Sequence, residues 1–94
     1  MKMHNPAHPG RILAQFLGDL SITVVAKHLC VTRTTLSRII HGRSSVSADM
    51  ALRLEQVIGL DAETWLAMQT QRDLWVASQK KQPKLKRMTL DVAA

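Results

Sequence analysis

The hydrophobic and polar positions of this chain follow a helical period over most of its length. Apolar residues recur three or four positions apart between residues 9 and 78, which predicts helices with one buried face. Residues able to cap a helix precede these stretches, and glycines follow several of them. We therefore predict an all-α domain of five helices, at about Pro9–Leu17, Ile22–Leu29, Arg33–His41, Ala48–Ile58 and Ala62–Ser78.

The last predicted helix spreads its apolar residues around more than one face. A helix with so wide an apolar surface usually packs against two partners. One partner is the core of the same domain, and we expect the other to be a second subunit. Three large side chains, Trp65, Met68 and Trp75, are predicted to fill the core or a dimer contact.

The two ends of the chain lack this pattern, so we divide it into a flexible N-terminus (residues 1–8), a folded domain (9–78) and a basic C-terminal tail (79–94). Residues 79–87 are polar and basic with one proline, which is typical of a linker. Met88–Val92 then alternates apolar and polar residues, the period of a strand that needs an edge from another chain. The alternative is a frayed terminus.

Residues Ile22–His41 have the spacing of a helix-turn-helix. Counted from Ile22, apolar residues fall at positions four, eight, ten, fifteen and eighteen, and the small Ala26 stands where two helices would cross closely. The second helix of such a motif lies in the major groove of DNA. The motif therefore predicts a sequence-specific DNA-binding protein.

The outward positions of the predicted recognition helix carry side chains that suit DNA. Arginine pairs with guanine edges, threonine methyls contact thymine methyls, and the N–H groups at a helix start bind phosphate. The alternative for each residue is a solvated surface position. We expect DNA contacts from Thr32, Arg33, Thr34, Ser37, Arg38 and Arg43, with Lys27, His41, Ser44 and Ser45 as further candidates for phosphate contacts.

The net charge of +6 is unevenly distributed along the chain. Residues 1–45 hold six Lys and Arg against one acid, residues 46–79 hold two against five, and residues 80–94 hold five against one. The positive charge thus accompanies the predicted motif and the tail, as expected for a protein that binds a polyanion.

Other kinds of site find little support in the sequence. The single cysteine, Cys30, cannot form an internal disulfide, which fits a reducing compartment. No apolar run suits a signal peptide or approaches the roughly 20 residues of a membrane span. His4 and His8 are four residues apart, but Pro6 prevents the helix that would align them for a metal. We expect no metal, no cofactor and no enzyme activity, in a cytoplasmic protein that associates with the nucleoid and not with a membrane.

With these residues in view, the chain resembles the HigA-type (VapI-like) antitoxins of the Xre/Cro helix-turn-helix family. The resemblance runs from His8 to about Ala77 and rests on HPGRIL at 8–13, AKHLCVTRTTLSRIIHGR at 26–43, SADMALRLEQVIG at 47–59 and WLAMQTQRDLWVA at 65–77. It implies a lambda-repressor-like domain that forms a homodimer and represses its own operon from a palindromic operator. It also implies binding of a small basic RelE-like toxin, an mRNA endonuclease. The alternative is a prophage-type repressor with no toxin partner.

Two positions depart from the pattern of the family. Such motifs usually have glycine at the turn, where the backbone is left-handed. This chain has Cys30 there, and we expect either a cost on the order of 1 kcal/mol or an altered bend. Many relatives begin the second helix with a Gln that touches the DNA backbone, and Ile22 cannot make that contact.

Overall fold

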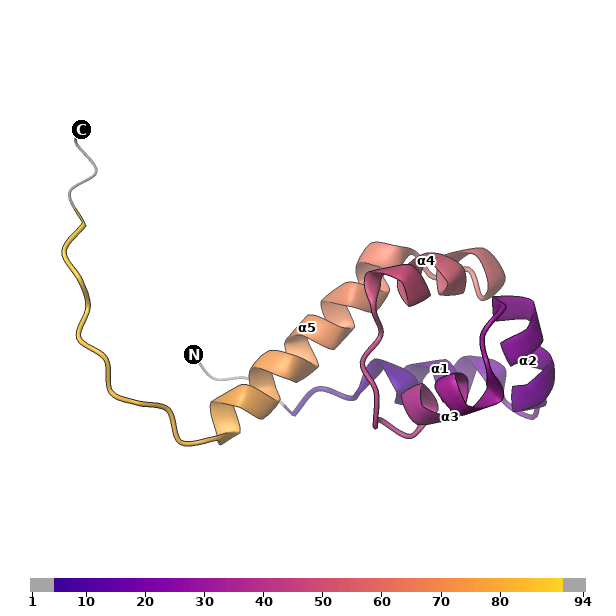
Figure 1. The fold of residues 1–94 in the computed structure, drawn as a ribbon, viewed down its shortest axis with the longest axis horizontal. Coiled ribbons are helices and arrows are strands. Elements are labelled where there is room, and N and C mark those ends of the chain that lie inside the picture. The colour runs from indigo at the N-terminus through magenta and orange to yellow at the C-terminus, as the bar shows by residue number, and fades with distance from the viewer. Residues whose placement is uncertain (1–4, 91–94) are drawn as a thin grey trace.

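A computed structural model describes residues 5–90 of the chain. Those residues form five helices and no strand, which confirms the predicted all-α fold (Figure 1). Three helices end one residue away from the predicted position, because the last turn of a helix frays. The helices are α1 (Pro9–Leu17), α2 (Ile22–Leu29), α3 (Arg33–Ile40), α4 (Ala48–Val57) and α5 (Ala62–Gln79).

A polar side chain caps the start of every helix. At each of the four later helices, the side chain of the residue before the helix accepts an N–H three positions on, which satisfies one of the unpaired donors of the first turn. Side-chain and backbone hydrogen bonds with Thr64 also hold the pKa of the exposed Asp61 carboxyl below its usual value. The four caps are Ser21, Thr32, Ser47 and Asp61.

One apolar core holds the five helices together. Trp65 of α5 is fully buried, its indole N–H donates to the carbonyl of Leu60 at 3.0 Å, and its ring centroid lies 6.1 Å from that of Phe16. Burial of each large side chain contributes roughly 1.5–3 kcal/mol, so a domain this small depends on every one of them. The buried apolar set is Leu13, Leu17, Val25, Ala26, Leu29, Leu36, Ile39, Val46, Met50, Ala51, Leu54 and Trp65.

The start of α1 crosses the end of α3 at a distance that only glycine permits. A Cβ atom on Gly10 would lie 1.8 Å from the carbonyl oxygen of Ile39. The preceding residue, Pro9, is buried at the first position of α1, where its missing N–H costs nothing. This close contact fixes α3 against α1 and leaves the opposite side of α3 free.

Residues 5–8, the described part of the predicted flexible N-terminus 1–8, contact the helical domain. The guanidinium of Arg72, on α5, donates to the Asn5 side chain at 2.8 Å and to the Pro6 carbonyl at 3.1 Å. His8 caps α1, since its Nδ1 accepts the N–H of Gly10 at 2.9 Å. The two Arg72 contacts join segments more than 60 residues apart, which the local pattern could not reveal. Residues 1–4 lie outside the described part of the chain.

Residues 80–90 leave α5 as an irregular, exposed segment (Figure 1). The strand predicted at Met88–Val92 is absent from Met88–Leu90, because a strand needs a paired edge and the domain is entirely helical there. Asp91 and Val92 lie outside the described residues. Within residues 5–90, no single helix is long and apolar enough to cross a membrane; α1 and α2 pass that test only as a pair, which is bent by 110°.

Candidate nucleic-acid interface

Helix α3 presents a polar face to solvent while its other face is held by the core. Leu36 and Ile39 are buried, whereas Arg33, Thr34 and Arg38 are exposed and Ser37 is half-buried. Ser37 stands four residues after Arg33, and Arg38 stands four residues after Thr34, so the four predicted contact residues lie on one side of the helix. The structure therefore gathers the predicted contacts on one accessible surface.

The start of α3 is organised by two threonines. The Thr32 hydroxyl accepts the N–H of Thr35 at 3.0 Å and pairs with the Thr35 hydroxyl at 2.8 Å. The N–H groups of Arg33 and Thr34 lie ahead of the hydrogen-bond ladder of the helix, so they are available to an anion. The Thr35 side chain is a partner that the sequence pattern did not single out.

The loop after α3 folds back onto the end of that helix. The carbonyl of Arg38 accepts the N–H of Arg43 at 2.8 Å and the N–H of Ser44 at 3.3 Å. His41 Nδ1 lies 2.8 Å from the carbonyl of Ser37, and since a carbonyl can only accept, the imidazole donates here. Four of the predicted contact residues, Ser37, Arg38, His41 and Arg43, together line one shallow depression.

The turn between α2 and α3 has the left-handed residue that the motif requires. Cys30 has φ 57° and ψ 42°, its N–H bonds to the carbonyl of Lys27, and the next N–H, on Val31, bonds to Ala26. This is a Schellman motif with cysteine in the usual glycine position. The Cys30 side chain is exposed.

A side chain from α4 braces this turn. The guanidinium of Arg53 donates to the carbonyl of Leu29 at 2.8 Å and to that of Cys30 at 3.3 Å, and it pairs with Asp49 at 3.1 Å. Two carbonyls at the end of α2, which no helix residue can satisfy, thus receive a charged donor. Arg53 therefore fixes the angle at which α3 leaves α2.

A second brace fixes the loop that joins α3 to α4. The N–H of the buried Val46 donates to the side-chain oxygen of Gln69 at 2.8 Å, and the Gln69 amide donates to Asp73 at 2.9 Å. Gln69 is the buried polar residue of the domain, and both ends of its side chain are paired. Because α5 supplies this contact, the helix sets the position of residues 43–45.

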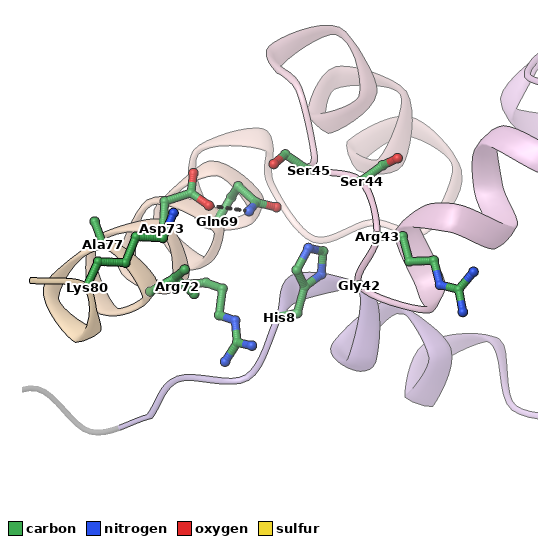
Figure 2. A pocket seen from close by; sticks show the side chains of 11 residues that line it. His8, Gly42, Arg43, Ser44, Ser45, Gln69, Arg72, Asp73, Ala77 and Lys80 are labelled. Atoms are coloured by element: carbon green, nitrogen blue, oxygen red, sulfur yellow. Dashed lines mark hydrogen bonds between the residues drawn. The ribbon is translucent and has the colours of Figure 1, made fainter.

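Between α5 and this loop lies a polar pocket that contains His8 (Figure 2). His8 comes from the start of α1, with the loop residues 42–45 on one side of it and Arg72 of α5 on the other. Burial of the imidazole, aided by the positive charge of Arg72, holds the pKa of His8 below its ordinary value of 6.5, against the opposing effects of Asp73 and the Ser44 backbone. The neutral imidazole of His8 therefore lies where three segments meet, namely the start of α1, the loop 42–45 and α5.

The remaining predicted residues occupy different places. Lys27 is exposed on α2, and Ser45 is exposed on the loop, whereas Ser44 is half-buried. Trp75 is half-buried on α5 with the Arg72 guanidinium 5.4 Å from its ring centroid, and Met68 packs against the core. Trp65 and Trp75 thus lie in different environments, one inside the core and one at its edge.

Among residues 5–90, no three His, Cys, Asp or Glu side chains gather in a way that could hold a metal ion. His4, one of the two histidines considered for a metal site, lies outside that range. The pocket around His8 and the depression beside α3 are open, and arginine side chains are part of the lining of both. Such surfaces suit contact with a large anionic partner.

Three residues that position the interface, His8, Arg53 and Gln69, were missed in the sequence. Only Gln69 left a periodic signal, because it stands four residues after Trp65 on the same buried face of α5. His8 directly precedes the helix-starting proline, a position from which a side chain can cap. Arg53 contacts a carbonyl 24 residues away, and no local pattern encodes such a contact.

Comparisons with known proteins converge on one kind of domain. A family model described as Helix-turn-helix matches residues 12–65, more than half of the chain. Virulence-associated protein A′ of Dichelobacter nodosus is 45% identical over 76 residues, which cover 78% of this chain and 66% of that protein. The chain therefore spans slightly less than two thirds of the length of that relative.

Two solved structures are similar in both sequence and fold. An addiction module antidote protein of a HigA family from Coxiella burnetii has a TM-score of 0.74 and 35% identity, covering 86% of this chain and 100% of that one. The antitoxin HigA of Pseudomonas aeruginosa, solved with the higBA promoter, has a TM-score of 0.73 and 36% identity, covering 77% of this chain and 82% of that one.

Proposed function

Because this chain belongs to the HigA-type (VapI-like) antitoxins of the Xre/Cro helix-turn-helix family, we propose that it is a DNA-binding antitoxin that represses its own operon. The observation that carries the proposal is the polar face of α3, with Arg33 and Arg38 exposed on a helix that the core holds rigidly. The HigA structure with promoter DNA supports the same role. The protein acts by binding and not by catalysis, in the cytoplasm at the nucleoid.

In this proposal α3 enters the major groove of a palindromic operator. Arg33 and Arg38 reach base edges or phosphates, and the uncommitted N–H groups at the start of α3 face a phosphate. The loop after α3 grips the DNA backbone. The proposed DNA contacts are Thr32, Arg33, Thr34, Ser37, Arg38 and Arg43. Further phosphate contacts are proposed from Lys27, His41, Ser44 and Ser45.

A palindromic operator requires a two-fold dimer whose recognition helices lie about 34 Å apart. Helix α5 supports this assembly, because Leu74, nine residues after Trp65 and on the opposite side of the helix, is 52% exposed. Leu74→Lys is expected to give monomers in sedimentation velocity. Gln71→Lys, at an exposed position of the same helix, is the matched control and should leave the dimer intact. If both variants form dimers as stable as those of the unchanged chain, the dimer contact does not lie on this face of α5.

The DNA contact is tested with the double variant Arg33→Ala/Arg38→Ala on a duplex from the promoter of its own operon. Both side chains are exposed, so thermal stability should change by about 0.5 kcal/mol or less while specific binding is lost. Arg33→Lys/Arg38→Lys keeps the charge but not the bidentate geometry, so it should retain binding to random DNA and lose preference for the operator. Unchanged operator binding by the Ala variant would contradict the assignment of α3.

The proposed protein partner is a small basic RelE-like mRNA endonuclease toxin, which the antitoxin holds inactive. A toxin gene beside this one, and a stable complex on co-purification, are the expected results. The tail and the N-terminal face are the two candidate contacts, and deletion of residues 79–94 followed by a pull-down separates them. A chain that binds its operator but has no adjacent toxin gene and captures no such partner is instead a prophage-type repressor.

A further inference from the structure

Residues 80–90 form a continuous basic segment. All eleven residues are exposed and none belongs to a helix or strand. Repulsion between like charges, together with Pro83, keeps such a segment extended. It contains no acidic residue, and its cations are Lys80, Lys81, Lys84, Lys86 and Arg87.

This segment begins beside the loop that follows α3. Lys80 lines the same pocket as residues 43–45, and Figure 2 shows it on the α5 side of His8, opposite that loop. The carbonyl of Ala77 accepts the N–H of Lys80 at 3.2 Å and the Gln82 amide at 2.9 Å, so the end of α5 directs the first tail residues. The first cation of the tail, Lys80, therefore lies at the edge of the α3 interface, and the other tail cations follow it along the chain.

We propose that residues 80–90 are a second DNA contact, made to the sugar-phosphate backbone that flanks the half-site bound by α3. This inference rests on the proposed function. Eleven extended residues at about 3.3–3.6 Å each reach about 36–40 Å, slightly more than one duplex turn of about 34 Å. A duplex presents one negative charge per about 1.7 Å, so every tail cation finds a phosphate within that reach.

The chemistry of the tail favours DNA over a protein partner. The proposed toxin is basic, and a segment with five cations repels it. Leu85 falls on one side of an extended chain while Met88 and Leu90 fall on the other, so they form no continuous apolar face. Lysines on flexible stems bind phosphate as point charges without reading bases. The tail therefore adds affinity that is independent of sequence and sensitive to salt.

The experiment compares the full chain with a variant in which the five tail cations become glutamine: Lys80→Gln, Lys81→Gln, Lys84→Gln, Lys86→Gln and Arg87→Gln. Affinity for operator and scrambled duplexes is measured by fluorescence anisotropy over a range of salt concentrations. For at least two lost phosphate contacts per subunit, which is four in the proposed dimer, the log–log salt dependence should become shallower by about 3.6, and binding to both duplexes should weaken on the order of tenfold or more. A salt dependence identical to that of the full chain overturns the proposal.

The matched control is Leu85→Ser/Met88→Ser/Leu90→Ser, which keeps every tail cation. It should bind DNA like the full chain, whereas a loss equal to that of the glutamine variant would show that apolar contacts matter and would overturn the proposal. On a shorter duplex that ends at the edge of the half-site, the full chain and the glutamine variant should bind with equal affinity, because the flanking backbone is missing. If the full chain fails to prefer the operator over scrambled DNA, the proposed function fails, while the salt dependence still decides the tail.

Discussion

The guanidinium of Arg53 donates a hydrogen bond to the backbone carbonyl of Leu29 at 2.8 Å, although 24 residues separate them in the chain. This contact ties α4 to the end of α2, one residue before the left-handed turn at Cys30. The recognition helix therefore depends on a side chain outside the helix-turn-helix for its direction. A hydrogen bond from a charged donor stabilises the fold by roughly 1.5–3 kcal/mol.

We expect Arg53→Met, which keeps the aliphatic stem, to lower the free energy of unfolding by about 1.5–3 kcal/mol in urea. Specific operator binding should weaken as well, because α3 loses its brace. The Asp49→Ala variant removes only the exposed ion pair of Arg53 and should cost less than about 1 kcal/mol. Equal losses in the two variants would mean that the carbonyl contact contributes little.

The left-handed backbone at Cys30 leads to the second prediction. Cys30→Gly should raise the free energy of unfolding by up to about 1 kcal/mol, because glycine adopts φ 57° without a Cβ penalty. Cys30→Ala keeps the Cβ and should leave stability nearly unchanged, since the cysteine side chain is exposed. The measurement is a pair of urea melts under reducing conditions, and a stabilising alanine would count against backbone strain as the cause.

The third prediction concerns the contact between α1 and α3. Gly10→Ala should destabilise the domain by more than about 3 kcal/mol or prevent folding, because its Cβ would lie 1.8 Å from the Ile39 carbonyl oxygen. Circular dichroism melts provide the readout. Gln15→Ala, on the exposed side of α1, controls for alanine in the same helix and should melt within a few degrees of the unchanged chain. A Gly10→Ala protein that melts normally would show that α1 can shift freely.

His8 makes stability depend on pH, which is the fourth prediction. Its pKa in the folded chain is lowered below 6.5, so the unfolded chain binds the proton more tightly. The contribution of neutral His8 to the free energy of unfolding is complete above about pH 6.5, and it is lost as the pH falls through the pKa of His8 in the folded chain. Protonation also removes the Nδ1 acceptor of the Gly10 N–H. Urea melts at several pH values should therefore show a steeper loss below pH 6.5 for the unchanged chain than for His8→Asn, which can cap the helix but does not titrate. If the stability of the two proteins falls equally with pH, His8 is not the source of the pH dependence.

The sequence by itself determined where the helices begin and which face of α3 is exposed. Caps and apolar spacing act within one or two helical turns, so Ser21, Thr32, Ser47 and Asp61 marked the helix starts correctly. The left-handed turn at Cys30 was expected from the resemblance to the helix-turn-helix family, whose members usually have glycine at that position.

Only the tertiary structure decided which contacts hold α3 and its neighbouring loops in place. Gly10 against Ile39, Arg53 on the Leu29 carbonyl and Gln69 on the Val46 N–H join segments more than 20 residues apart. Arg72 likewise contacts Asn5 and Pro6, in a segment without helical periodicity. Residues 88–90, where a strand was expected beside an edge from another chain, are irregular in the single chain. Side-chain periodicity records which face of an element is buried, whereas a hydrogen bond to a distant carbonyl depends on where the packed helices place that carbonyl.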